Sequence, residues 1–91
     1  MGRTTPLKPA PRSAAALLRK ARAADRAGRV TEAIKLYDGL IRVGMEQDEL
    51  AVVDEAYRHL SVLHHRRNQP LLAKSLCEAS HKLATQIGIP L

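Results

Sequence analysis

Apolar residues recur every three or four positions over most of the chain, and polar or glycine-containing stretches interrupt the pattern. Within residues 30–43 one helical face carries Val30, Ala33, Ile34, Tyr37 and Leu40. This spacing predicts an amphipathic helix. Helix-ending residues mark the interruptions, namely Gly28, Gly44, Asn68 and Gly88. Ser13 is a suitable N-cap and Pro70 suits a first helical turn. The pattern therefore predicts four helices, over about 14–27, 30–43, 49–67 and 70–87.

The second pair of predicted helices repeats the first about forty residues later. Leu17, Ala21 and Ala24 correspond to Tyr57, Ser61 and His64, and the Gly28 turn with Val30, Ala33 and Tyr37 corresponds to Asn68 with Pro70, Ala73 and Cys77. Two copies of one helix-turn-helix unit are typical of an α-helical repeat protein. We therefore predict an all-α fold of four antiparallel helices, with hairpins over 13–44 and 48–88 in one domain, 13–88.

The two ends of the chain lack this pattern. Residues 1–12 hold three prolines and no apolar periodicity, which predicts a disordered, basic arm. Residues 89–91 form a short tail after the last predicted helix.

Positive charge is concentrated in the first third of the chain. Residues 1–30 hold eight basic side chains and one acid, a net charge of +7, whereas residues 31–91 have a net charge of −1. A partner with an acidic patch is the natural interpretation, and a nucleic acid is the alternative from another class. An aromatic platform or DNA-reading motif is missing from the sequence, so a protein partner is favoured.

Several functional classes find no support in the sequence. Cys77 is the one cysteine, so an intramolecular disulfide is excluded, and no apolar run reaches the ~18–20 residues that cross a bilayer. Both points favour a cytoplasmic protein. No nucleophile–base arrangement or phosphate-binding glycine loop is present, so we expect neither an enzyme nor a cofactor. His64, Cys77 and His81 are too few for a closed zinc site, so no metal is expected.

The last predicted helix has two apolar faces. Ala73, Cys77, Ser80 and Ala84 form a small-residue stripe suited to packing on the preceding helix. The second stripe consists of Leu72, Leu76, Leu83 and Ile87. We expect this second stripe to be an interface, covered by a partner, by further repeats or by another copy of the chain in a homo-oligomer.

These features resemble the tetratricopeptide repeat (TPR) family, whose hairpins combine paired large and small residues with a glycine near the turn. The first unit matches at Leu17, Ala21, Gly28, Ala33 and Tyr37, and the second at Tyr57, Leu60, Ser61 and Ala73. Asn68, Cys77 and Lys20 depart from the family pattern. The resemblance covers about residues 14–87 and implies a right-handed helical repeat that acts as an adaptor or scaffold. The period exceeds the usual 34 residues, and an acidic loop at 45–49 is expected to absorb the difference.

The first two predicted helices also resemble microtubule-interacting and transport (MIT) domains, which bind helical peptide motifs in membrane trafficking. Lys20, Ala21, Asp25, Gly28, Glu32, Ala33, Ile34, Leu36 and Tyr37 carry this second resemblance. Those domains are three-helix bundles, so the fourth helix predicted here would be left over.

The TPR resemblance also implies a binding surface, because the first helices of successive hairpins line a concave peptide groove in that family. The corresponding residues are Leu18, Arg22, Asp25 and Arg26 in the first unit and Arg58, Val62, His65 and Arg66 in the second. Arginine forks hold carboxylates with two hydrogen bonds. We therefore predict a protein or peptide partner, with an acidic segment as the favoured ligand.

Overall fold

The chain forms four helices over the residues that the structure describes. The structure is a computed structural model, and it describes residues 13–86. The helices are α1 (Ala14–Arg26), α2 (Val30–Glu46), α3 (Leu50–Arg66) and α4 (Pro70–Gln86), with no strand within residues 13–86. The predicted all-α class is confirmed. The predicted arm, the tail and the end of the predicted domain at residues 87–88 lie outside the described residues.

The three turns between the helices are built alike. Each has three residues, and its middle residue has a positive φ: 80° at Gly28, 60° at Asp48 and 62° at Asn68. In each turn the third amide donates to a carbonyl five residues earlier, from Arg29 to Ala24, Glu49 to Gly44 and Gln69 to His64. Left-handed residues of this kind end helices. The predicted helix-ending roles of Gly28 and Asn68 are confirmed.

The prediction that Gly44 ends the second helix is wrong. α2 continues to Glu46, Gly44 is buried within it, and Asp48 is the left-handed residue of the turn. A Cβ atom at Gly44 would collide with the Val53 side chain of α3, so glycine here permits the close approach of two helices. The expected acidic loop at 45–49 is also wrong. The long period instead reflects long helices, since α2, α3 and α4 each have 17 residues.

The core is small and consists of one tyrosine among aliphatic side chains. Its largest fully buried side chains are Tyr37, Leu40, Val53, Leu60 and Leu63. Alanines fill the spaces between them, with Ala21, Ala24, Ala33 and Ala56 fully or almost fully buried. Close-packed interiors leave little room for change. The α1–α3 part of the molecule therefore depends on short side chains at the helix crossings.

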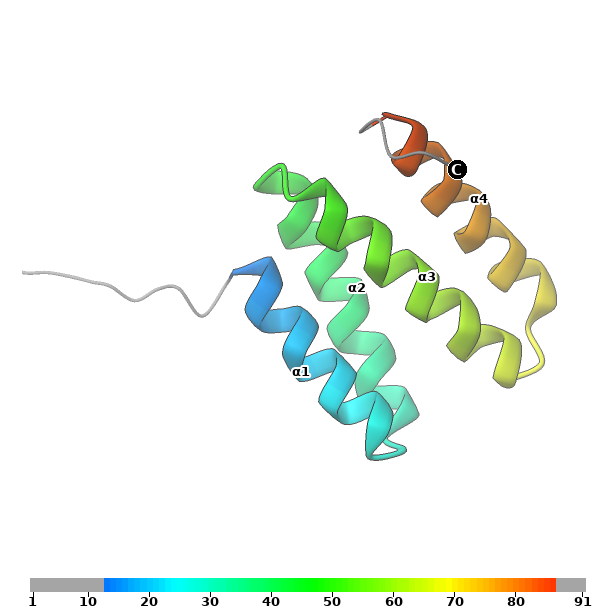
Figure 1. Cartoon of the computed structure of the whole chain (residues 1–91). Coiled ribbons are helices and arrows are strands. Elements are labelled where there is room, and N and C mark those ends of the chain that lie inside the picture. The colour runs from blue at the N-terminus through cyan, green and yellow to red at the C-terminus, as the bar shows by residue number, and fades with distance from the viewer. Residues whose placement is uncertain (1–12, 87–91) are drawn as a thin grey trace, which may run out of the picture.

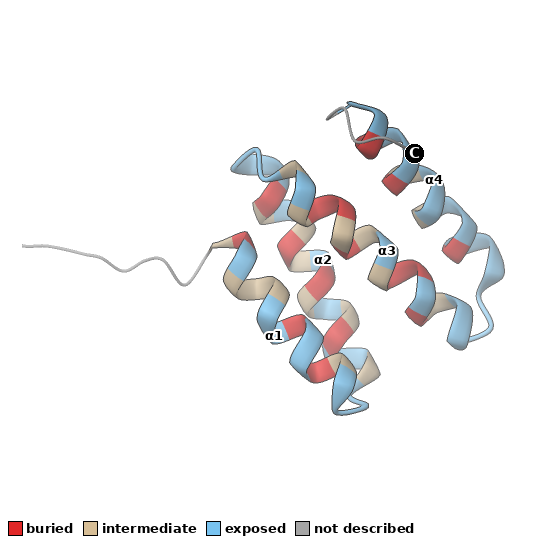
Figure 2. Ribbon diagram, viewed as in Figure 1, coloured by how far each residue is buried: buried red, intermediate tan, exposed pale blue. Residues whose placement is uncertain are grey.

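α3 is the central helix, lying between the α1–α2 pair and α4 (Figure 1). Successive helices run in opposite directions, as the colour sequence in Figure 1 shows. α4 packs mainly against α3, and its buried positions face that helix (Figure 2). Three of those positions belong to the predicted small-residue stripe: Ala73, Ser80 and Ala84. That part of the prediction is confirmed, whereas the fourth stripe residue, Cys77, is exposed.

The second stripe predicted on α4 is not a continuous exposed surface. Leu83 is only 5% exposed and Leu76 packs against the core, so neither side chain is open in the single chain. Leu72 is 43% exposed, and Ile87 lies outside the described residues. The premise that all four face away from the fold is therefore wrong, because α4 is rotated so that Leu83 joins its buried side. Self-association through this end of the molecule remains a prediction.

Candidate functional site

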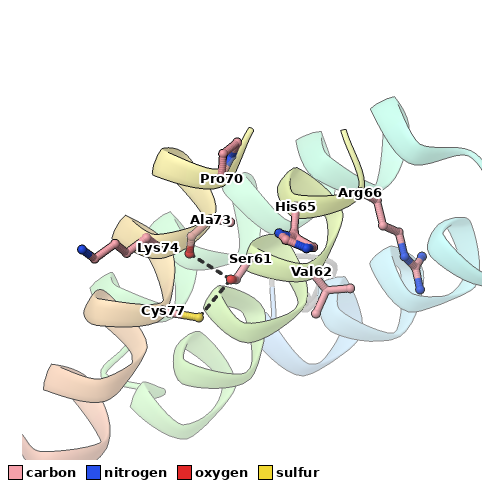
Figure 3. Close-up of a pocket in the computed structure, with 8 residues that line it drawn as sticks. All are labelled: Ser61, Val62, His65, Arg66, Pro70, Ala73, Lys74 and Cys77. Atoms are coloured by element: carbon pink, nitrogen blue, oxygen red, sulfur yellow. Dashed lines mark hydrogen bonds between the residues drawn. The ribbon is translucent and has the colours of Figure 1, made fainter. Parts of the chain in front are cut away.

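A groove lies between α3 and α4 at the end of the molecule where Asn68 joins them. Its volume is about 520 Å³. α3 contributes Ser61, Val62, His65 and Arg66, and α4 contributes Pro70, Ala73, Lys74 and Cys77 (Figure 3). We call this hollow the α3–α4 groove. Its size suits one or two side chains of a bound segment.

Hydrogen bonds from Ser61 hold the two walls of the groove together. The Ser61 hydroxyl donates to the Ala73 carbonyl at 2.9 Å and lies 3.0 Å from Cys77 Sγ (Figure 3). Ser61 is buried, so this bond satisfies a polar group that water does not reach freely. Small side chains at positions 73 and 77 leave the space that a larger residue would fill. The floor of the groove is therefore mostly apolar, and a hydrogen bond between its two walls crosses it.

The rim of the groove is positively charged. Arg66 extends from the α3 side and Lys74 from the α4 side (Figure 3), and the lining residues include no carboxylate. Arg66 has one carboxylate partner among the described ion pairs, Asp25 of α1, at 4.0 Å. The Arg66 side chain is 67% exposed, so this pair contributes little and is easily exchanged for another carboxylate.

The residues predicted from the TPR resemblance fall into two groups. Val62, His65 and Arg66 line the α3–α4 groove. The others lie outside it. Leu18 packs against the core, and Arg26 is exposed on α1. The remaining three face oppositely charged side chains: Arg22 lies 3.8 Å from Glu55, Arg58 lies 3.4 Å from Asp54, and Asp25 lies 4.0 Å from Arg66. The α3–α4 groove is thus flanked by α3 and α4, whereas the expected groove lay between the first helices of the hairpins.

Sequence reasoning missed the α4 side of the groove. The sequence pattern indicates a helix start at Pro70 and a packing stripe through Ala73 and Cys77, and it assigns no role to Lys74. A signal was present in the sequence, because small residues at positions 73 and 77 face a serine at position 61. Small side chains on two facing helices produce either a tight contact or a hollow, and only the three-dimensional structure distinguishes the two.

A smaller hollow lies on α1. Arg19, Arg22 and Arg26 line it, and its volume is about 240 Å³. We call this surface the arginine face. Its members are spaced by three and four residues, which places them on one side of the helix.

A buried tyrosine connects α1, α2 and α3 next to the predicted site residues. Tyr37 of α2 is fully buried, and its hydroxyl donates to Asp25 Oδ2 across a long 3.5 Å contact. The ring stacks on His59 of α3 with centroids 5.3 Å apart, and His59 Nε2 lies 3.3 Å from Glu55. These contacts hold Asp25 close to Arg66, and so fix the α1 carboxylate that neighbours the groove rim.

The ionisation of Tyr37 makes the fold sensitive to alkali. Burial, with a further contribution from the Asp25 carboxylate, raises the pKa of Tyr37 to about 12 from its usual value of about 10. Between these two values unfolding releases the phenolic proton, so rising pH favours unfolding by up to about 1.4 kcal/mol per pH unit. Below about pH 10 the contribution of protonated Tyr37 to the stability of the fold is fully present.

We therefore expect a Tyr37→Phe variant to lose part of the alkaline fall in stability. Urea unfolding followed by circular dichroism from pH 9 to 12 measures this, with Tyr57→Phe as the control for loss of a phenol elsewhere. The same pH dependence in Tyr37→Phe and in the wild type would contradict the assignment.

The described residues offer no candidate for two other kinds of site. No cluster of three or more histidine, cysteine, aspartate or glutamate side chains within residues 13–86 is placed to hold a metal ion. Over the same residues, none of the four helices combines the length and apolar character required to span a membrane.

Comparison with protein-family models, curated proteins and solved structures gave no match for this chain.

Proposed function

We propose that this protein is a protein-interaction module that binds an acidic segment of a partner in the α3–α4 groove. The observation that carries the proposal is the combination of an apolar floor with a rim of Arg66 and Lys74. An apolar side chain of the partner would occupy the space beside Ala73 and Cys77. Carboxylates on either side of it would pair with the two rim cations.

Two properties of the rim support an acidic ligand. Arg66 presents a guanidinium fork that suits carboxylates, and its present partner Asp25 is 4.0 Å away. Lys74 is exposed on the opposite wall, where it adds a second positive charge. A basic or neutral segment would leave Lys74 without a carboxylate and Arg66 with only its 4.0 Å contact to Asp25. An acidic segment adds electrostatic attraction to the burial of its apolar side chain.

The finer architecture belongs to the same proposal. We interpret the four helices as two TPR-like hairpins in a right-handed repeat, with α1–α2 as one hairpin and α3–α4 as the other. The repeated turn at Gly28, Asp48 and Asn68 supports a regular stack of helices. The packing of α4 on α3 also supports it, because an MIT-like three-helix bundle leaves this helix unaccounted for.

Selection from a random twelve-residue peptide library, with the immobilised full chain as bait, tests the proposal. We expect enriched peptides to be acidic and to carry at least one large apolar residue. An Arg66→Glu/Lys74→Glu variant should bind those peptides at least about tenfold more weakly, because reversing two rim charges replaces attraction with repulsion.

The matched control is Arg42→Glu/Lys82→Glu, which makes the same change in net charge at two exposed cations outside the groove. This variant should keep most of the affinity, and circular dichroism should show that both variants remain helical. Enrichment of neutral or basic peptides, no enrichment at all, or equal losses in the two variants would each overturn the proposal.

A further inference from the structure

The arginine face of α1 differs in chemistry from the α3–α4 groove. Within residues 13–86 its lining consists of Arg19, Arg22 and Arg26, so three guanidinium-bearing side chains border this hollow. Within residues 13–86, Arg19 and Arg26 form no ion pair, and Arg22 has only the 3.8 Å contact with Glu55. That pair is half exposed and contributes little. The face therefore presents an almost uncompensated positive charge.

The charge of this lining indicates the kind of ligand. Protein–protein interfaces bury an apolar core inside a polar rim, whereas the lining residues of the arginine face within residues 13–86 are all cations, whose aliphatic stems supply its apolar surface. Interfaces with nucleic acid are more polar and far more positively charged. A densely charged polyanion therefore fits this face better than a folded protein surface or an anchored peptide.

The spacing of the three arginines suits a linear polyanion. Arg19 and Arg26 are seven positions apart, a rise of about 10 Å at 1.5 Å per residue. Duplex nucleic acid presents one negative charge per ~1.7 Å of its axis, so about six phosphates lie along that length. The preceding residues of the sequence add Arg3, Lys8 and Arg12 to the same end of the chain.

We propose that the arginine face of α1 binds the phosphodiester backbone of nucleic acid without sequence preference. The guanidinium groups of Arg19, Arg22 and Arg26 each contact a phosphate, and binding releases the condensed counterions. This site is separate from the α3–α4 groove, so the protein would bind a nucleic acid and an acidic protein segment on different surfaces.

Fluorescence anisotropy of a labelled random-sequence twenty-base-pair duplex, titrated with the full chain at 50–200 mM salt, tests the proposal. Each phosphate contact adds about −0.9 to the slope of log affinity against log salt. An Arg19→Gln/Arg22→Gln/Arg26→Gln variant should therefore have a slope shallower by about 2.7 than the wild type. Circular dichroism checks that the variant keeps its helices.

Two control variants make the result specific. Lys35→Gln/Arg42→Gln/Lys82→Gln makes the same change in net charge at exposed cations elsewhere and should leave the slope within about one unit of the wild type. The Arg3→Gln/Lys8→Gln/Arg12→Gln variant measures how much the residues before α1 contribute to binding, as distinct from the helix itself. No binding by the wild type at 50 mM salt would overturn the proposal. So would an unchanged slope in the α1 variant, or equal losses in the first control.

The ligand class and the two sites are also distinguishable. An extended poly-glutamate chain carries its charges about twice as far apart as a duplex does, so at an equal concentration of charge it should displace the duplex poorly. Displacement as strong as that by unlabelled duplex would overturn the choice of nucleic acid. The Arg66→Glu/Lys74→Glu variant should keep the salt slope of the wild type, and the α1 variant should keep binding the selected peptides. Failure of the peptide selection alone would thus overturn the proposed function of the groove and not the proposal for the arginine face. Failure of duplex binding alone would overturn the proposal for the arginine face and not that for the groove.

Discussion

A Gly44→Ala variant is expected to lose about 2–3 kcal/mol of unfolding free energy, although alanine is normally the better helix former. A Cβ atom at this position would collide with Val53 Cγ2 and lie 3.8 Å from the Ala14 Cβ. Val53 is fully buried and β-branched, so it cannot rotate away without displacing its neighbours. Overpacking of this kind costs about 1–3 kcal/mol. Because no flexible side chain nearby can move aside, we expect the cost of Gly44→Ala to lie toward the upper end of that range.

Gly39 provides the matched control on the same helix. A Cβ atom added there meets no atom within 4 Å, so Gly39→Ala introduces the same methyl group without a collision. That variant should gain about 0.5–1 kcal/mol, because glycine inside a helix is less stable than alanine by that amount. Urea unfolding of the two variants, followed by circular dichroism, measures the difference. Stabilisation by both substitutions would show that α2 and α3 are less closely packed than described.

Local turn chemistry was the part of the fold that the sequence predicted best. Ser13 accepts a hydrogen bond from the Ala16 amide at 3.1 Å, and Pro70 begins α4. Gly28 adopts the left-handed conformation expected of it. These residues act on their own neighbours in the chain, so their roles follow from local physics. Asp48 was missed as a helix-ending residue because Gly44, four positions earlier, is the stronger signal by residue type.

The arrangement of α4 on α3 was predicted only in part. Asp54 and Ser80 are both buried, and each contributes a polar atom to this contact. The predicted small-residue stripe placed Ser80 correctly against α3, but the charged Asp54 counts as exposed in any pattern of apolar and polar positions, although paired polar groups can be buried. Leu83 was wrongly left outside, whereas it shares the buried side of α4 with that stripe. The groove was missed because Ala73 and Cys77 were assigned to close packing, and the structure instead has a hollow beside them.

The Asp54–Ser80 bond should determine whether α4 stays attached. The Ser80 hydroxyl donates to Asp54 Oδ1 at 2.5 Å, and Arg58 lies 3.4 Å from the other carboxylate oxygen. Asp54→Ala would leave a buried hydroxyl without its acceptor and remove a hydrogen bond to a charged group. Together these losses amount to about 2–3 kcal/mol. α4 packs mainly on α3, so we expect the helix to open locally and not to unfold the whole domain.

Amide hydrogen exchange measured by mass spectrometry locates the effect. In Asp54→Ala the α4 amides should exchange roughly a hundredfold faster, while those of α2 keep their protection. Asp54→Asn retains an acceptor oxygen and should restore most of the protection. Thr85→Ala is the control on α4, because Thr85 Oγ1 is exposed and donates only to the His81 carbonyl of its own helix.

Equal acceleration in all four helices would mean that α4 and the α1–α3 core unfold together. In that case the α3–α4 groove could not open independently of the rest of the fold. Acceleration confined to α4 would instead make this polar pair the contact that keeps the groove assembled.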